Sequence, residues 1–70
     1  MQTIDFEIEG DYIELFKLLK ASGVCSTGGE AKMLIDEGEV MVNGETETRK
    51  GKKIIPEDRV TLFDVEITVL

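Results

Sequence analysis

Half of the cations in this chain lie on one short segment. Four of the eight Lys and Arg residues fall close together, although the formal net charge is -7: Arg49, Lys50, Lys52 and Lys53. Each Lys or Arg that neutralises a phosphate releases counterions from a nucleic acid, which makes binding favourable and strongly salt dependent. Gly51, inside the cluster, allows the backbone to approach a ligand closely. We therefore expect a phosphate-binding loop here, although solvation alone also explains many runs of charge.

A second candidate site lies at Thr27-Gly28-Gly29. Thr27 and Glu30 have the spacing of a reciprocal capping box, which predicts a helix that begins at about Thr27. The first N–H groups of a helix point outward at the positive end of its dipole and can receive a phosphate. Lys32, one turn further on, would lie nearby. The alternative is a capped helix whose glycines serve only the turn, because Glu30 repels an anion unless its capping bond holds it.

The residues that follow predict the elements between these two sites. Gly38 is the type of residue that commonly ends a helix in the left-handed conformation. Val40 and Val42 then alternate with more exposable neighbours before Asn43-Gly44, a dipeptide that favours a type I′ turn. We expect a β-hairpin that returns through residues 45 to 48, in which Asn43-Gly44 has a structural role.

The N-terminal residues alternate between apolar and acidic side chains, with Ile4, Phe6 and Ile8 on the apolar face. This period of two predicts a strand with one solvent-exposed, acidic face. Asp11 and Glu14 again have capping-box spacing and predict the start of a first helix. The apolar stripe expected along that helix has helical spacing: Tyr12, Leu15, Phe16 and Leu19.

Lys17 and Lys20 lie three residues apart, and hence close together, on this first helix. They are secondary candidates for phosphate contact. The alternative is that they solvate the outer face of the helix, with Lys17 paired to Glu14.

The C-terminal part of the chain completes a sheet. Pro56 begins a turn-like stretch over residues 56–58, because proline fixes φ and removes a hydrogen-bond donor. Residues 59–63 and 65–70 are rich in β-branched and bulky apolar side chains, which is typical of strands. We expect an α+β fold in which two helices from the N-terminal half pack on a small, mainly antiparallel sheet that includes the N-terminal strand. Residues 1–70 are expected to form a single domain.

Composition excludes several classes of protein. A domain of about this size buries only about 60% of the surface of its unfolded chain, so a large internal active site is not expected. Contents of 41% hydrophobic and 33% charged residues are typical of a soluble globular protein. No apolar run approaches the roughly 20 residues that span a bilayer, and the N-terminus lacks the features of a secretory signal. A cytoplasmic location is expected.

The sequence offers little for catalysis or metal binding. Cys25 is the single cysteine and histidine is absent, so neither an internal disulfide nor a Cys/His zinc site is expected. We expect Cys25 to be a small buried group in the turn between the helices. Because no nucleophile–base pair at useful spacing and no nucleotide-binding fingerprint is present, we expect no enzymatic activity and no cofactor.

Several spaced residues occur in the order seen in a known family. Roughly residues 12–62 resemble the RNA-binding domain of ribosomal small-subunit protein S-four, also called the alpha-L motif. The stretches STGGEAK, GEVMVNGE and ETRKGKKI look like its small stand-alone members, the YbcJ and YaaA type. The residues that carry the resemblance are Gly23, Ser26-Thr27, Ala31, Leu34-Ile35, Gly38, Val40 and Val42-Asn43-Gly44.

The resemblance implies the alpha-L fold and contact with RNA, with two departures. The wider family usually has a basic residue where this chain has Gly28, and an arginine in the first helix where this chain has Glu14. The resemblance then implies that Lys32 and the cationic cluster carry the binding. The RNA-binding candidates are Thr27, Gly28, Gly29, Lys32, Arg49, Lys50, Lys52 and Lys53, with Lys17 and Lys20 as secondary contacts.

The function expected from these observations is non-catalytic binding of a structured RNA, such as ribosomal or transfer RNA, through a basic edge. The chain would have two faces, because residues 1–14 contain five carboxylates and no cation. All four aromatic residues fit apolar patterns, so recognition by shape and backbone is favoured over base stacking. The alternative is a protein–protein adaptor with the same fold. No DNA specificity or membrane partner is indicated, and a monomer is favoured.

Overall fold

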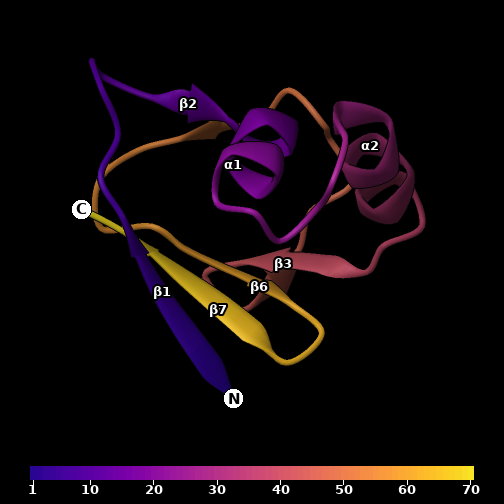
Figure 1. The fold of residues 1–70 in the computed structure, drawn as a ribbon. Helices are drawn as coiled ribbons and strands as arrows, with labels where there is room; N and C mark the ends of the chain where they lie inside the picture. Colours follow the sequence, from indigo (N-terminus) through magenta and orange to yellow (C-terminus); the bar gives the residue numbers. More distant parts are fainter.

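The computed structural model describes all 70 residues, and it places two helices on one side of a five-stranded sheet (Figure 1). β1 pairs parallel with β7, and all other neighbours in the sheet are antiparallel. The expected α+β fold with a mainly antiparallel sheet is therefore confirmed. The strand order across the sheet is β1 (Gln2–Phe6), β7 (Val65–Val69), β6 (Arg59–Leu62), β3 (Val40–Val42) and β4 (Glu45–Thr46).

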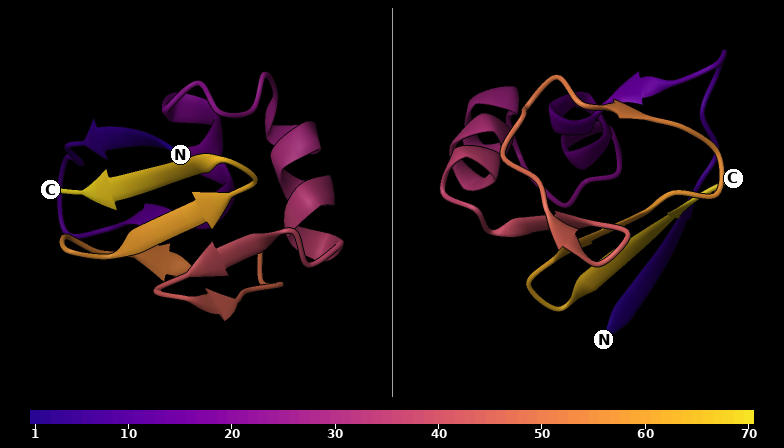
Figure 2. Two further views of the ribbon diagram at one scale, coloured as in Figure 1. Left: turned by 90° about the horizontal axis from the view of Figure 1, so that it is seen from below. Right: turned by 180° about the vertical axis from the view of Figure 1, so that it is seen from behind.

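The core lies between the sheet and the helices α1 (Leu15–Ala21) and α2 (Gly28–Asp36). Successive side chains of a strand point to opposite faces, so alternate residues of β3, β6 and β7 point toward the helices. The other face of the sheet carries no helix (Figure 2, left). All buried side chains are apolar: Leu15, Leu18, Leu19, Cys25, Ala31, Ile35, Val40, Val42, Ile54, Val60, Leu62, Ile67 and Val69.

Cys25 occupies the position expected for it, between the two helices, where it is only 2% exposed. Burial raises the pKa of its thiol, and the nearby Glu30 carboxylate raises that pKa further. Neither helix is long and apolar enough to cross a lipid bilayer.

Helix α2 and the hairpin after it form as the sequence predicts. The Thr27 hydroxyl accepts a hydrogen bond from the backbone N–H of Glu30 at 3.1 Å, and Glu30 Oε1 accepts one from Ser26 N at 3.0 Å. Gly38 has a φ of 78° just beyond the C-terminal end of α2. Asn43 and Gly44 have φ values of 53° and 84°, as a type I′ turn between β3 and β4 requires.

The start of α1 differs from the prediction, because the helix begins at Leu15 and not near Asp11. Its N-cap residue, Glu14, has an extended backbone and makes no side-chain capping bond, so the predicted Asp11–Glu14 capping box is wrong. Ile13 and Glu14 form β2, which pairs with β5 (Lys53–Ile54) in a separate two-stranded ribbon. Pairing with a distant segment keeps these residues extended, and local spacing does not reveal such a partner.

Two smaller differences concern the end of β1 and the position of Tyr12. β1 ends at Phe6, so the half-buried Ile8, which was predicted to belong to this strand, lies beyond its end. Tyr12 precedes β2 and lies outside the helix, with 46% of its surface exposed. The apolar face of α1 consists of Leu15, Leu18 and Leu19, and Tyr12 does not belong to it.

Candidate nucleic-acid interface

The basic loop, residues 49–53, leads from the β4 edge past the helices into β5 (Figure 2, right). Its backbone is attached to the first turn of α1. The N–H of Leu15 donates to the carbonyl of Lys52 at 2.9 Å, and the N–H of Phe16 donates to the carbonyl of Lys50 at 3.1 Å. The first N–H groups of a helix lack partners within the helix, so the loop carbonyls satisfy two of them. The backbone N–H groups at the start of α1 are therefore already hydrogen-bonded to the loop, while the loop presents its cationic side chains to solvent.

Phe16 is the point where α1, α2 and the basic loop meet. The ammonium groups of Lys32 and Lys17 lie 4.6 and 5.8 Å from the centroid of its ring. A Cβ added at Gly28 would lie 3.8 Å from Cδ2 of the same ring. Because the backbone N–H of Phe16 is also hydrogen-bonded to the loop, this one residue contacts both candidate sites, through its ring and through its backbone.

The sequence left two roles open for the N-terminal end of α2, a structural cap and a phosphate-binding site, and the structure has features of both. Its threonine hydroxyl is used by the cap, and the Glu30 carboxylate is held by Ser26, as a purely structural cap requires. The N–H groups of Gly28 and Gly29 nevertheless donate to no protein acceptor. Lys32 is exposed on the next turn. The capping function is confirmed, and phosphate contact at this point stays a prediction.

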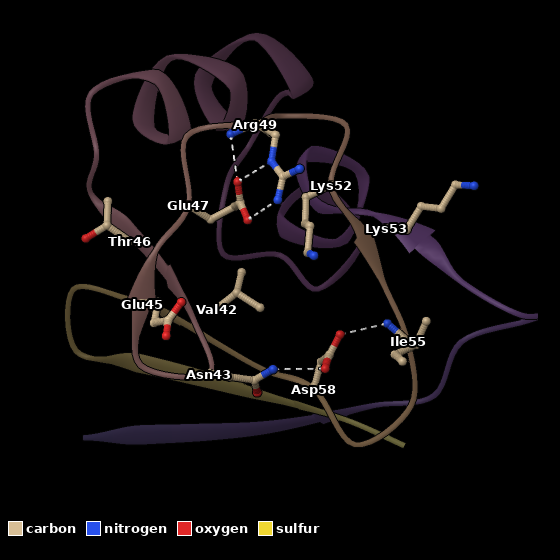
Figure 3. Close-up of a pocket in the computed structure, with 10 residues that line it drawn as sticks. All are labelled: Val42, Asn43, Glu45, Thr46, Glu47, Arg49, Lys52, Lys53, Ile55 and Asp58. Carbon is tan, nitrogen blue, oxygen red and sulfur yellow. Dashed lines mark hydrogen bonds and ion pairs between the residues drawn. The ribbon is translucent and has the colours of Figure 1, made fainter.

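A polar hollow of about 390 Å³ lies between the basic loop and the β3–β4 hairpin (Figure 3). Arg49 and Lys52 line it, together with the carboxylates of Glu45, Glu47 and Asp58. Lys53 also lies at the hollow, but its side chain points away from the other residues (Figure 3). The hollow therefore carries charges of both signs and is not a uniformly cationic surface.

The carboxylate of Glu47 holds Arg49 in place. Glu47 Oε2 accepts hydrogen bonds from the backbone N and from Nε of Arg49 at 3.1 and 2.9 Å, and Oε1 accepts one from a terminal guanidinium nitrogen at 3.2 Å. These hydrogen bonds lower the pKa of Glu47 and raise the pKa of Arg49. The guanidinium remains largely exposed, with 72% of the side-chain surface accessible, so it can still meet a phosphate.

Asp58 and Asn43 form a polar connection that local sequence patterns do not indicate. The side-chain amide of Asn43 donates to Asp58 at 3.0 Å, and the backbone N–H of Ile55 donates to the other carboxylate oxygen at 3.0 Å. Asn43 also accepts a hydrogen bond from the backbone N–H of Arg59 at 2.9 Å. Asp58 therefore joins the hairpin turn to the start of β6 and has a structural role. The structural role predicted for Asn43 is confirmed.

The expected separation of charge is only partly present. Asp5, Glu7, Glu9 and Asp11 are exposed and make no ion pair with the basic loop, as the two-faced interpretation requires. Glu14 does not belong with them: its carboxylate lies 3.0 Å from Lys17 Nζ and would lie 3.5 Å from a Cβ added at Gly51. The prediction that all N-terminal carboxylates form an acidic back is wrong at this residue.

Glu14 and Glu47 each pair with one candidate cation, and most of the candidate lysines make no ion pair. The alternative interpretation of Lys17, an ion pair with Glu14, is confirmed. Lys20 lies in the last turn of α1 and has no contact that joins it to the Phe16 group. The candidate cations that make no ion pair are Lys20, Lys32, Lys50, Lys52 and Lys53.

Residues 6–70, nearly the whole chain, match the S4 domain family. The chain belongs to the S4-domain family. Its S4 domain is 39% identical over 59 residues to the "Putative RNA-binding protein YbcJ" of Escherichia coli (strain K12), and the match covers 84% of each chain. It is 38% identical over 55 residues to the "Probable ribosome maturation protein RlbA" of Bacillus subtilis (strain 168), with 79% of this chain and 78% of the relative covered.

The three-dimensional comparison agrees with the sequence comparison. The solution structure of E. coli YbcJ superposes with a TM-score of 0.71 at 36% identity, and the match covers 100% of this chain and 87% of that chain. That structure is described as revealing an alpha-L motif involved in RNA-binding. The resemblance read from the sequence is therefore confirmed, as is the arrangement of two helices on a mixed sheet.

The structure shows what the two departures mean in this S4 domain. Gly28 has no left-handed φ, and a Cβ there would meet only ordinary contact with Phe16. No backbone geometry demands glycine at this position, so the chain lacks a cation that the site has room to hold. Glu14, at the second departure, places an anion directly beside the basic loop.

The aromatic side chains are the main feature of the S4 domain that sequence reasoning missed. All four were assigned to apolar patterns, but Tyr12 is 46% and Phe63 is 63% exposed. Phe63 lies in the turn between β6 and β7, with a φ of 53°. Tyr12 lies beside the basic loop, with Lys53 Nζ 4.9 Å from its ring centroid. No local spacing distinguishes these residues from core positions, since their exposure follows from the β2–β5 pairing and from the turn.

Proposed function

We propose that this S4 domain binds structured RNA, of the ribosomal or transfer class, through the basic loop and the N-terminal end of α2. The observation that carries the proposal is the attachment of the loop to α1. Hydrogen bonds to Leu15 and Phe16 fix the loop backbone, while the side chains of Lys50 and Lys53 stay exposed. An array of cations on a fixed backbone binds phosphates with less loss of conformational freedom than a mobile one.

The family and its named relatives support an RNA ligand. An S4 domain, a relative named as an RNA-binding protein and another named as a ribosome maturation protein all agree with it. Double-stranded RNA displays phosphates and 2′-hydroxyls and is recognised mainly by shape. Lysines are mobile point charges and suit an irregular sugar-phosphate path better than a reading of base edges.

The test is salt-dependent binding of RNA hairpins by the complete chain and by a variant with Arg49, Lys50, Lys52 and Lys53 all replaced by Gln. Each phosphate contact contributes about 0.7–0.9 to the slope of log K against log salt. The variant should bind far more weakly and lose up to about three units of that slope. Its melting temperature should change little, because three of the four side chains are exposed and Lys52 is half-buried, and most substitutions of exposed side chains alter stability by less than about 0.5 kcal/mol.

A matched pair of single variants separates local contact from net charge. Lys50→Gln removes a cation from the basic loop, whereas Arg59→Gln removes the one cation outside the candidate set, on β6. Only the first should weaken binding appreciably. Normal binding by the fourfold variant would refute the proposed site, and capture of a nuclease-resistant protein partner in its place would favour the adaptor. Crosslinking in cells followed by sequencing would distinguish ribosomal from transfer RNA.

A further inference from the structure

Tyr12 is an exposed aromatic side chain at the margin of the basic loop. Nearly half of its surface is accessible, at 46%. The ammonium group of Lys53, a residue of the loop, lies over the ring at 4.9 Å from the centroid. A ring face is therefore presented next to one of the cations proposed to bind phosphate.

The short β2–β5 ribbon explains this placement. Ile13 pairs with the buried Ile54, and side chains alternate along a strand. The neighbours on each side of this pair therefore turn outward, and among them Tyr12, Lys53 and Ile55 are all exposed. The carbonyl and amide groups that connect the ribbon to α1 hold its backbone in place. The ring is thus an exposed apolar surface on a fixed backbone, next to a mobile cation.

We propose that Tyr12 stacks against an unpaired base of the bound RNA while Lys53 contacts the phosphate beside that base. This inference rests on the proposed RNA-binding function and narrows its ligand: the preferred RNA has a bulge, a loop or a single-stranded end beside its helix. Unstacked bases commonly bind to aromatic side chains in this way, whereas bases inside a continuous duplex are not accessible to them.

Competition for the ring favours the base. An exposed cation–π contact such as that of Lys53 corresponds to about a 2- to 5-fold effect on an equilibrium constant. Stacking of one base on an aromatic side chain corresponds to about a 5- to 150-fold effect on affinity, as judged by alanine substitution. Lys53 also gains a phosphate partner when it leaves the ring. Replacement of the Lys53 contact by a stacked base is therefore favourable both for the ring and for the ammonium group.

The chain itself provides a specific probe of this contact. It contains one tyrosine and no tryptophan, so its tyrosine fluorescence reports Tyr12 alone. Two RNAs of equal length would be titrated: a hairpin with a single-nucleotide bulge and a fully paired hairpin closed by a short non-nucleotide linker. We expect quenching of the tyrosine emission by the bulged RNA and little quenching by the fully paired one.

Three variants complete the experiment. Tyr12→Phe keeps the ring and should bind the bulged RNA normally, whereas Tyr12→Ala should bind it about 10-fold more weakly. Tyr12→Ala should bind the fully paired RNA as the wild-type chain does, with the same salt slope. Phe63→Ala removes the other largely exposed aromatic side chain, which lies in the β6–β7 turn, and should leave both affinities unchanged.

The outcomes distinguish this inference from the function on which it rests. Salt-dependent binding of both RNAs, without quenching and with unchanged affinity of Tyr12→Ala, would overturn the stacking contact and leave the RNA-binding function intact. Absence of salt-dependent RNA binding by the wild-type chain would overturn both. The quenching measurement uses the unaltered chain, so it decides the matter even where a variant folds poorly.

Discussion

Replacement of Glu14 by Gln should strengthen RNA binding while it weakens the fold. Glu14 lies where α1 begins, with its carboxylate 3.0 Å from Lys17 Nζ and its backbone paired with Lys53. Gln has nearly the same shape and no charge. The substitution therefore removes an anion from the margin of the basic loop and releases Lys17 from its ion pair.

The cost in stability follows from two exposed interactions. The pair with Lys17 joins side chains that are 37% and 60% exposed, and such i,i+3 pairs contribute about 0.3–0.5 kcal/mol. A carboxylate at the positive end of a helix contributes about 0.3–1 kcal/mol. The free energy of unfolding should therefore fall by about 1 kcal/mol, which corresponds to about 4–8 °C in the melting temperature of a domain of this size.

The gain in binding follows from Coulomb's law. A carboxylate about 7 Å from a phosphate in water repels it by ~0.6 kcal/mol, so its removal alone increases affinity about 3-fold. Lys17 then becomes available as a further cation, and each additional phosphate contact also steepens the salt dependence. We expect an increase of about 3- to 10-fold in affinity at low salt, which diminishes as salt screens the charges.

Fluorescence anisotropy with a labelled RNA hairpin, at a series of salt concentrations, measures this effect. Asp5→Asn is the matched control, because it removes one negative charge from the exposed strand β1, away from the basic loop. If Asp5→Asn increases affinity as much as Glu14→Gln does, the effect is one of net charge and not of position. Weaker binding by Glu14→Gln would refute the reasoning, since it would show that the carboxylate organises the binding surface.

Two further predictions concern the fold. Thr27→Ala removes the N-cap of α2 and should lower the free energy of unfolding by about 1 kcal/mol in urea denaturation, whereas Ser26→Ala, whose hydroxyl makes no capping bond, should have little effect. The native Cys25 thiol should react slowly with a disulfide reagent, because it is buried and its pKa is raised. The folded state then holds a proton that the unfolded state releases, so stability should fall as pH rises from the unfolded pKa through the folded one, and Cys25→Ala should abolish this contribution. Rapid reaction of the native thiol would contradict the second prediction.

Helix α2 and the β3–β4 hairpin were predictable because neighbouring residues determine them. The capping bonds join residues three and four positions apart, and the turn depends on the φ values that Asn43 and Gly44 tolerate. The basic loop was recognisable because cations were concentrated on it. These features depend on residues that are close together in the sequence, so the order of residues is enough to predict them.

The start of α1, the exposure of Tyr12 and the position of Glu14 could not be predicted in the same way. All three depend on the pairing of Ile13 and Glu14 with Ile54 and Lys53, which are far away along the chain. The same spacing at residues 11–14 that suggests a capping box also suits an extended segment. Local propensity does not decide between the two when a distant partner stabilises one of them.

The amino-acid sequence by itself determined the family, the layer arrangement and the residues that can neutralise phosphate, because periodicity, turn chemistry and residue type are local properties. The tertiary structure alone decided how those cations are arranged, since hydrogen bonds between distant residues attach the basic loop to the start of α1. It also decided that Phe16 joins the two candidate sites and that Tyr12 faces solvent. Exposure and contacts between distant residues depend on distances in space, and folding sets those distances.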